Sequence, residues 1–552
     1  MSKENEIQLL LFAEESMRVG KLAHAKEVLK KIIYHNSFQP RANELLAYLA
    51  GNEGDLDGAI DLLRKAVRVP NPSNQALYEL GSLCFQKGLL EEAVNCFKQS
   101  ISLSNNSFDV YHDLALALGM LGKSTEAVDL MLKALTINSN SAEACYNLGR
   151  LYDDLKMYAK SLDAYEYALS LNSNFIQAHI NKGIALYELN HPDLALQSYR
   201  EALKIDPKSL DALLNQGMAF QALNRYEEAL DSYNLAIAIN DQFVDAKWNK
   251  SLAQLSVGNF KEGWKNYEYR FDAVKTNPRR FENIPVLSSL NQLRGSRVLV
   301  WCEQGFGDTL QFCRYIPLMK ELGGDIVFLV QKPLEELMNS LGSCAVIVDE
   351  LLMGKVSYQV PIMSLPKLFS TDAFNIPAQV PYLRVGKKSL NPHWESNKKF
   401  KIGVACSGNP SHLNDARRSM PLEIILPLLD LGEIHLIQKR LNSIDKAIAN
   451  AHSNIIYYGD EIKNFQDSAS LVVNMDAIVT VDTSLAHLSG ALNQRTFVCL
   501  PYSAEWRWQV ERSDSPWYPS AMIFRQPNLG DWKAVIQKVY VALQELVNTN
   551  KR

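Results

Sequence analysis

Several features are scarce or absent in this sequence, and each absence excludes a class of protein. The eight cysteines lie singly, without a Cys-x-x-Cys pair, which argues against a zinc site and for the reduced, buried thiols of a cytoplasmic protein. The formal net charge is only −4, so no excess of basic residues predicts nucleic acid or an anionic membrane as a partner. The longest apolar run near the start, residues 9–13, is far too short to span a bilayer. We therefore expect no signal peptide and no transmembrane segment.

Tryptophan is missing from the first 247 residues, and all eight tryptophans lie at or after Trp248. A chain of 552 residues is too long for one hydrophobic core. The change in composition therefore predicts at least two regions of different architecture.

A 34-residue period runs through the first half of the chain, with repeats starting at residues 6, 40, 74, 108, 142, 176, 210 and 244. The eighth and twentieth positions are small in every repeat. The twenty-fourth position is always large: Leu29, Leu63, Phe97, Met131, Tyr165, Tyr199, Tyr233 and Tyr267. Small residues let two helices cross closely, and the large residue fills the space beside the crossing. This period and pattern resemble the tetratricopeptide repeat (TPR).

The sixth repeat position is asparagine in the last four repeats: Asn147, Asn181, Asn215 and Asn249. In the family that the repeats resemble, this position lies on the helix that lines the concave face. An asparagine side chain can bind both the N–H and the C=O of an extended peptide. One interpretation is a ladder that binds a polypeptide partner, and the other is that asparagine is merely common at this site.

The period is lost after Phe271, and apolar strands then alternate with helical stretches. We predict an all-α repeat array over 6–271, a connector over 272–295, and two Rossmann-like α/β domains over 296–385 and 399–552. Residues 386–398 are polar and indicate a linker. A long helix from Trp532 to about Val547 is expected to close the second domain. In such sheets the ligand lies beyond the carboxyl ends of the strands.

The segment that follows the first strand is the first candidate. It contains Gln304, Gly305, Gly307, Asp308 and Thr309. Its glycines allow the backbone to approach a ligand, and Asp308 would open the next helix. The alternative is a helix-capping aspartate in a tight turn.

Two further candidate loops also follow strands. The first contains Ser407, Gly408, Asn409, Arg417 and Arg418, and suits an anion unless the arginines are solvated surface charges. The second contains Gln438 and Lys439, whose ammonium can hold a phosphate.

The strand at 477–481 leads into the fourth candidate, Asp482, Thr483, Ser484 and His487. Free N–H groups at the start of the helix predict an anion site for a diphosphate. The alternatives are an ordinary helix cap and a helical histidine whose hydrogen bonds are satisfied. The later segment 505–518 is rich in aromatics and arginine, and predicts either the wall of a sugar or base site or a domain interface.

Together these motifs resemble a glycosyltransferase of the GT-B type. The segments GDTLQF at 307–312 and DTSLAH at 482–487 are similar to motifs of lipopolysaccharide heptosyltransferases. The whole chain resembles bacterial TPR-containing glycosyltransferases, a group related to O-linked N-acetylglucosamine transferase. The resemblance implies a nucleoside diphosphate sugar as donor, Asp308 as the base, and Lys439 with Asp482, Thr483, Ser484 and His487 around the diphosphate and ribose. The chain has no counterpart of the histidine proposed as catalytic in O-linked N-acetylglucosamine transferase, which argues against that particular activity.

No Asp-x-Asp triplet occurs after residue 295, so we expect a metal-independent, inverting transferase without a bound cofactor. The TPR array would recruit a protein or glycan acceptor, or another partner. The alternatives are an inactive TPR scaffold that uses its GT-B module for protein–protein interaction, and another GT-B enzyme such as a nucleotide-sugar epimerase.

Overall fold

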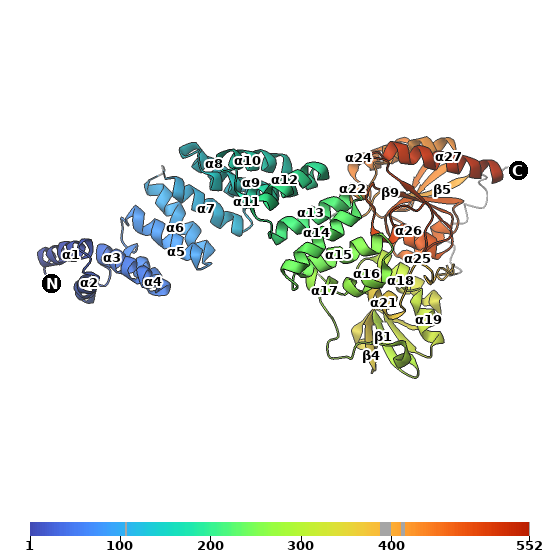
Figure 1. The fold of residues 1–552 in the computed structure, drawn as a ribbon, viewed down its shortest axis with the longest axis horizontal. Helices are drawn as coiled ribbons and strands as arrows, with labels where there is room; N and C mark the ends of the chain where they lie inside the picture. Colours follow the sequence, from blue (N-terminus) through green and yellow to red (C-terminus); the bar gives the residue numbers. More distant parts are fainter. Residues whose placement is uncertain (105–106, 276, 387–398, 410–414, 551–552) are drawn as a thin grey trace. The chain divides into compact units, whose positions relative to one another are not determined.

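The computed structural model describes residues 1–104, 107–275, 277–386, 399–409 and 415–550 (Figure 1). By its internal contacts the chain divides into two compact units, residues 1–207 and 208–552. Of the predicted linker 386–398, only Gly386 lies within the described residues.

The first unit consists of helical pairs, one pair for each of the first six repeats. Their bounds are α1 Lys3–Arg18, α2 Leu22–His35, α3 Pro40–Asn52, α4 Leu56–Ala66, α5 Asn74–Gln86, α6 Leu90–Leu103, α7 Phe108–Met120, α8 Ser124–Ile137, α9 Ala142–Asp154, α10 Tyr158–Leu171, α11 Ile176–Glu188 and α12 Pro192–Ile205. Position 15 of the repeat has a positive φ, as at Gly54 (83°) and even Lys156 (56°). A residue in the left-handed region ends the first helix of each pair and lets the second helix turn back.

The helical crossings confirm the predicted pairing of a small and a large residue. A Cβ on Gly81 would lie 2.6 Å from the ring of Phe97, and the phenyl ring itself is fully buried. Gly149 and Tyr165 stand in the same relation in the fifth repeat. Close packing at these crossings is what makes the period visible in the sequence.

The second unit begins with the last two repeats. Their helices are α13 Leu210–Ala222, α14 Tyr226–Ile239, α15 Val244–Ser256 and α16 Phe260–Tyr267, followed by the short α17 Arg270–Ala273. Two helices per repeat, α1 to α16, confirm the predicted eight repeats.

A four-stranded parallel sheet follows, in the order β3-β2-β1-β4. Its strands are β1 Arg297–Trp301, β2 Asp325–Leu329, β3 Ala345–Ile347 and β4 Tyr358–Pro361. In the central pair Leu299 lies opposite Val327, and on the other side opposite Gln359. The helices are α18 Phe306–Phe312, α19 Tyr315–Glu321, α20 Glu335–Met338 and α21 Leu365–Leu368.

A six-stranded parallel sheet completes the chain, in the order β10-β9-β8-β5-β6-β7. Its strands are β5 Lys401–Ala405, β6 Glu433–Leu436, β7 Ile455–Tyr457, β8 Ala477–Val481, β9 Thr496–Leu500 and β10 Ala521–Arg525. The helices are α22 Asp415–Arg418, α23 Leu422–Ile425, α24 Ser443–Ala451, α25 Phe465–Val472, α26 Ser484–Ala491 and α27 Trp532–Asn550. The long helix α27 packs Trp532, Val535 and Val539 into the core on one face of this sheet (Figure 1).

If β5 to β10 are numbered one to six in chain order, they lie side by side in the order 3-2-1-4-5-6, which is the order of the Rossmann fold. The four-stranded sheet has the same order, shortened by two strands. Parallel strands buried on both faces explain the continuous apolar runs in the sequence. The prediction of an all-helical array followed by parallel α/β sheets is therefore confirmed.

One hydrophobic core joins parts that the sequence pattern separates. It contains Leu255 and Trp264 of the eighth repeat, Val298 of the first sheet, and Ile478 and Trp517 of the second sheet region. By packing, the last two repeats therefore belong with the sheets, whereas the sequence pattern divides the chain near residue 271.

Candidate functional site

The carboxyl ends of β5 and β8 are the centre of the candidate site. These strands are neighbours, yet the chain continues from β5 toward β7 on one side and from β8 toward β10 on the other. Open α/β sheets bind their ligands in the crevice at such a reversal of strand order. Ser407–Asn409 follow β5 and Asp482–Ser484 follow β8, so the fold brings together two loops that are 73 or more residues apart in sequence.

Helix α26 begins at this crevice. Its N-cap residue Thr483 has extended dihedral angles, φ −139° and ψ 174°, and no side chain caps the helix among the described residues. The Thr483 hydroxyl instead shares a hydrogen bond of 3.2 Å with the hydroxyl of Thr480. The first N–H groups of α26 and the positive end of the helix dipole are therefore placed to attract an anion.

Arg418 connects the two loops. Its Nη1 donates to the Asp482 carbonyl at 3.2 Å, and its Nε donates to the Asp415 carboxylate at 3.4 Å. A Cβ on Gly408 would lie 2.6 Å from the Arg418 guanidinium, so glycine allows this approach. Arg417 lies beside it in the same short helix. The predicted basic loop thus supplies one cation directly to the crevice.

Gln438 braces the other side of the β5 loop. Its Oε1 accepts from the Cys406 N–H at 2.8 Å, and its Nε2 donates to the Ser407 hydroxyl at 3.0 Å. The neighbouring Lys439 is exposed, and its Nζ donates to the Ile462 carbonyl after β7. Lys439 is thus tied to that loop, and its predicted contact with a phosphate stays a prediction.

Asp482 is a buried carboxylate at the centre of the crevice. Burial raises the pKa of Asp482 to about 6, and the nearby Glu505 raises the pKa further, while Trp508, Arg418 and Arg507 oppose the shift. A carboxylate that holds its proton to about pH 6 changes the charge of this site near neutral pH.

His487 is packed between Tyr518 and Trp508. The imidazole is buried, shares a hydrogen bond of 2.9 Å between Nδ1 and the Tyr518 hydroxyl, and stacks on Trp508 with ring centroids 5.7 Å apart. Burial lowers the pKa of His487 well below its usual value, and Arg507 and Arg314 add to this. This geometry matches the alternative of a satisfied helical histidine.

The segment Gln304–Thr309 is in part helical. Helix α18 begins at Phe306 with Gly305 as its N-cap, so Asp308 lies within the first turn and does not open the helix as predicted. The Gln304 carbonyl accepts from Gln331 Nε2 at 3.1 Å, and the Thr309 hydroxyl donates to Gln331 Oε1 at 3.0 Å. A single glutamine after β2 therefore fixes both ends of this segment.

Helix α18 packs directly against the start of α26. A Cβ on Gly307 would lie 2.8 Å from Cδ2 of His487 and 3.7 Å from Cα of Ser484. Phe306 packs on Phe465 at the start of α25, with ring centroids 5.1 Å apart. The two candidate segments from the two sheets are thus in contact.

Both carboxylate oxygens of Asp308 are engaged. Oδ2 accepts from the Gly305 N–H at 2.8 Å, and Oδ1 pairs with Nη2 of Arg507. Burial raises the pKa of Asp308, although the Arg507 charge opposes the shift. Capping and ion pairing are therefore the contacts that the structure gives this residue, and its role as a base stays a prediction.

Arg507 belongs to the segment 505–518 and is a residue of the candidate site that the sequence pattern did not single out. It is buried, contacts Asp308 and Glu505, donates from Nε to Gln311 Oε1 at 2.7 Å, and lies 4.3 Å over the ring of Trp506. The signal in the sequence is an arginine between two tryptophans, which favours a buried, stacked guanidinium.

The aromatic segment 505–518 pins an interface, one of its two predicted roles. Trp506, in the 3-10 turn η8 Trp506–Trp508, meets Trp264 of α16 edge-on at 5.2 Å between centroids. Trp517 meets Phe312 of α18 at 5.6 Å. The segment thus joins the eighth repeat to both sheets.

The repeat asparagines already have partners within the chain. Asn147 is buried and shares a 3.3 Å hydrogen bond with His112 of the preceding repeat, and Asn181 donates to Tyr146 at 3.2 Å in the same way. Asn215 and Asn249 donate to carbonyls of their own helices. These bonds link neighbouring repeats or cap local backbone, and the peptide ladder stays a prediction.

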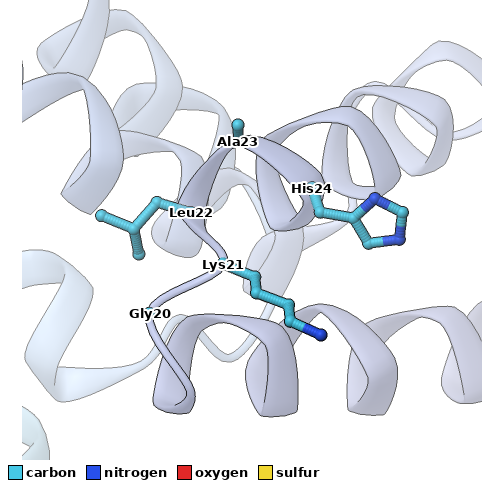
Figure 2. A pocket seen from close by; sticks show the side chains of 5 residues that line it. All are labelled: Gly20, Lys21, Leu22, Ala23 and His24. Atoms are coloured by element: carbon cyan, nitrogen blue, oxygen red, sulfur yellow. The ribbon is translucent and has the colours of Figure 1, made fainter.

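Two surface hollows on the described residues of the repeats contain none of the candidate residues of the α/β sheets. One hollow, of about 500 Å³, lies where the chain passes from α1 into α2 (Figure 2) and is lined by Gly20, Lys21, Leu22, Ala23 and His24. The side chain of Leu22 points to one side, and those of Lys21 and His24 both extend to the other.

Two features are absent from the described part of the chain: a cluster of metal ligands and a membrane-spanning helix. No group of three or more His, Cys, Asp or Glu residues within it is placed to hold a metal ion. None of its helices is both long and apolar enough to cross a membrane. His412, which lies between Asn409 and Arg417 in the predicted anion-binding loop, is outside the described residues.

Comparison with known proteins identifies the repeats. Models described as tetratricopeptide repeat match residues 142–175 and 180–242, and one described as TPR repeat matches residues 81–122. The N-terminal half of the chain therefore carries tetratricopeptide repeats.

One curated relative and two solved structures are similar to parts of the chain. Protein FlbA of Caulobacter vibrioides (strain ATCC 19089 / CIP 103742 / CB 15) is 24% identical over 315 residues, which cover 51% of this chain and 52% of FlbA. This chain thus spans about half the length of that relative. MamA is 28% identical, covering 30% of this chain and 95% of MamA, with a TM-score of 0.29. YrrB, a TPR protein with an unusual peptide-binding site, is 23% identical, covering 34% and 98%, with a TM-score of 0.31.

Proposed function

We propose that the chain is a metal-independent glycosyltransferase of the GT-B type, which binds a nucleoside diphosphate sugar at the carboxyl ends of β5 and β8. The observation that carries the proposal is the reversal of strand order there, flanked by the uncapped start of α26 and by Arg418. A diphosphate suits this arrangement because helix N–H groups and a guanidinium both donate to phosphate oxygens.

The donor's diphosphate would lie against Thr483 and Ser484, with Ser407–Asn409 on the opposite side of the crevice. The helix dipole of α26 and Arg418 would offset the charge that develops on the leaving diphosphate, which is how positioned donors stabilise a transition state. No Asp-x-Asp triplet follows residue 295 to supply the metal-binding carboxylates of other transferases. Asp482 reduces the repulsion of a bound anion when it is protonated.

The acceptor hydroxyl needs a base for inverting transfer. Asp308 is the candidate, because burial raises the pKa of its carboxyl and α18 lies against α26. Each carboxylate oxygen has more than one lone pair, so Asp308 can accept another hydrogen bond while it keeps Arg507.

The repeats would recruit a polypeptide, either the acceptor itself or a partner. Stacked helical repeats form extended concave surfaces that suit a protein or peptide chain. Because Asn147 and Asn181 donate within the array, we assign recruitment to the array as a whole and leave the four-asparagine ladder as a hypothesis.

The second candidate function is a scaffold without activity. It is favoured by the direct packing of α18 on α26 and by the internal partners of Asp308 and Lys439. A panel of nucleoside diphosphate sugars, incubated with the full chain and assayed for release of the nucleoside diphosphate, separates the two functions.

Asp308→Asn is the matched variant for this assay. Asparagine can still accept a hydrogen bond from Gly305 N–H but cannot act as a base. A transferase should lose turnover at least about a hundredfold with donor affinity retained. Turnover of the variant near that of the unchanged protein would move the base elsewhere, and absence of turnover and of donor binding in the unchanged protein would favour the scaffold.

A further inference from the structure

Arg270, the first residue of α17, is a fully buried arginine at the end of the repeats. Its guanidinium forks onto the carboxylate of Glu303, with Nε to Oε2 at 2.7 Å and Nη2 to Oε1 at 2.9 Å. Both side chains have no solvent exposure. A two-pronged arginine–carboxylate pair fixes orientation as well as distance.

The surroundings complete the pair. Arg270 also donates to the Ser364 hydroxyl at 2.8 Å and to Glu268 at 2.9 Å, while Glu303 accepts from the Met363 N–H at 3.1 Å. Glu303 follows β1, and Met363 follows β4. β1 and β4 flank the point where the first sheet reverses its strand order, which is where such a sheet would otherwise bind a ligand. The Arg270–Glu303 pair lies at this point.

Glu303 is also the residue directly before the segment Gln304–Thr309. This segment is therefore held at one end by Arg270 and at Asp308 by Arg507. Arg507, which holds Asp308, is also connected to the eighth repeat, because the neighbouring Trp506 packs on Trp264 of α16. The eighth repeat thus contacts both supports of the segment.

We propose that Arg270 is a positioning residue: through Glu303 it fixes the segment Gln304–Thr309, which carries the candidate base, against the start of α26. The eighth repeat is then part of the site. The consequence for turnover rests on the proposed function, whereas the placement of the segment does not.

Hydrogen exchange of the full chain measures the placement directly. Arg270→Met should raise amide exchange in residues 303–312 about tenfold or more through local opening, with residues 532–547 of α27 unchanged. Arg270→Lys keeps the charge but not the fork, and should give a smaller rise confined to the same segment. The control is Arg279→Met, because Arg279 is half exposed and pairs with Asp272 at 3.0 Å.

Calorimetric titration with uridine and guanosine diphosphates gives the second readout. In Arg270→Lys the Kd should stay within about twofold of the unchanged protein, since α26 and Arg418 belong to the other sheet, while kcat falls about tenfold at unchanged donor KM. If the kcat of the Arg270→Lys protein equalled that of the unchanged protein, a two-pronged contact with Glu303 would not be required.

The outcomes separate the proposals. Unchanged exchange in residues 303–312 of the folded Arg270→Lys protein would overturn the positioning role. Exchange that rises equally throughout residues 208–552 would also overturn it, because Arg270 would then support only the fold. If neither these two nor adenosine or cytidine diphosphate binds the unchanged protein, the proposed function fails, and the local exchange result still decides the role of Arg270.

Discussion

The two parallel sheets share a strand order, but different groups lie at the point where each sheet reverses that order. In the first sheet the ends of β1 and β4 are closed by the buried Arg270–Glu303 pair. In the second sheet the ends of β5 and β8 carry polar loops, an uncapped helix start and Arg418. The same topology therefore provides an attachment point for the repeats in one sheet and a candidate ligand site in the other.

This difference shows that strand order alone does not locate a ligand. Closing a crevice with a buried ion pair requires that every charge be compensated, since an isolated buried charge is costly. Arg270 and Glu303 meet this condition with the additional donors and acceptors around them. For Asp482 at the ends of β5 and β8, Trp508, Arg418 and Arg507 do not offset the effect of burial, and the pKa of Asp482 rises to about 6.

The largest expected effect comes from removing the attachment. A chain of residues 208–552 should fold, whereas a chain of residues 272–552 should not, because it loses Trp264 and leaves Glu303 buried without Arg270. The unpaired Glu303 alone should cost about 3–5 kcal/mol. Circular dichroism during thermal unfolding and size-exclusion chromatography would measure this. A cooperative transition of equal Tm in both chains would contradict the shared core.

The contact between the sheets predicts a smaller effect. Gly307→Val should destabilise the protein by about 1–3 kcal/mol, because its side chain would push α18 away from His487. Gly305→Ala is the control, since its Cβ would meet only Asp308 Oδ2, at 3.3 Å, and φ is −71°. Urea unfolding of the two variants compares them, and equal losses would show that α18 and α26 do not pack closely in solution.

Asp482 predicts a dependence of stability on pH. The pKa of Asp482 rises from 3.8 in the unfolded chain to about 6 in the fold. The unfolded chain therefore loses this proton first, and the stability from this group, complete below about pH 4, is lost as the pH rises through 6.

Asp482→Asn removes the titration. The free energy of unfolding of the variant, minus that of the unchanged protein, should be about 1 kcal/mol larger at pH 7.5 than at pH 5. Urea unfolding at both pH values measures the difference. A gain that is independent of pH would show that Asp482 keeps an ordinary pKa in the fold.

The smallest effect compares a buried and a more accessible repeat asparagine. Asn147→Ala should cost about 1 kcal/mol because it removes the bond to His112 in a buried site, whereas Asn215→Ala should cost a few tenths. Thermal unfolding of the full chain records both. Equal, negligible losses would restore the ladder interpretation, in which both amides await a peptide.

Regular patterns made most of the fold predictable. In every repeat a small residue at position 8 packs near a large residue at position 24, and position 15 is a turn residue in the left-handed region. The buried strands are visible as apolar runs. The short strands β3 and β4 are only three and four residues long, and the sequence pattern gave no bounds for them.

The site was predictable only in its backbone. The residues after β5 and β8 follow from the rule that parallel strands end at one edge. Asp308 pairs with Arg507, Lys439 donates to Ile462, and His487 shares a hydrogen bond with Tyr518. These partners lie 23 to 199 residues away in the chain. No local pattern specifies such long-range pairs.

The binding of nucleoside diphosphates to the full chain tests the difference between the two crevices most directly. At least one of the uridine, guanosine, adenosine and cytidine diphosphates should bind in calorimetry and raise the Tm. Arg418→Met should weaken that binding about tenfold, since it removes a charge-assisted hydrogen bond, and the exposed control Arg440→Met should stay within about twofold. Failure of all four to bind, or equal affinity in the Arg418→Met protein, would contradict a ligand site at the ends of β5 and β8.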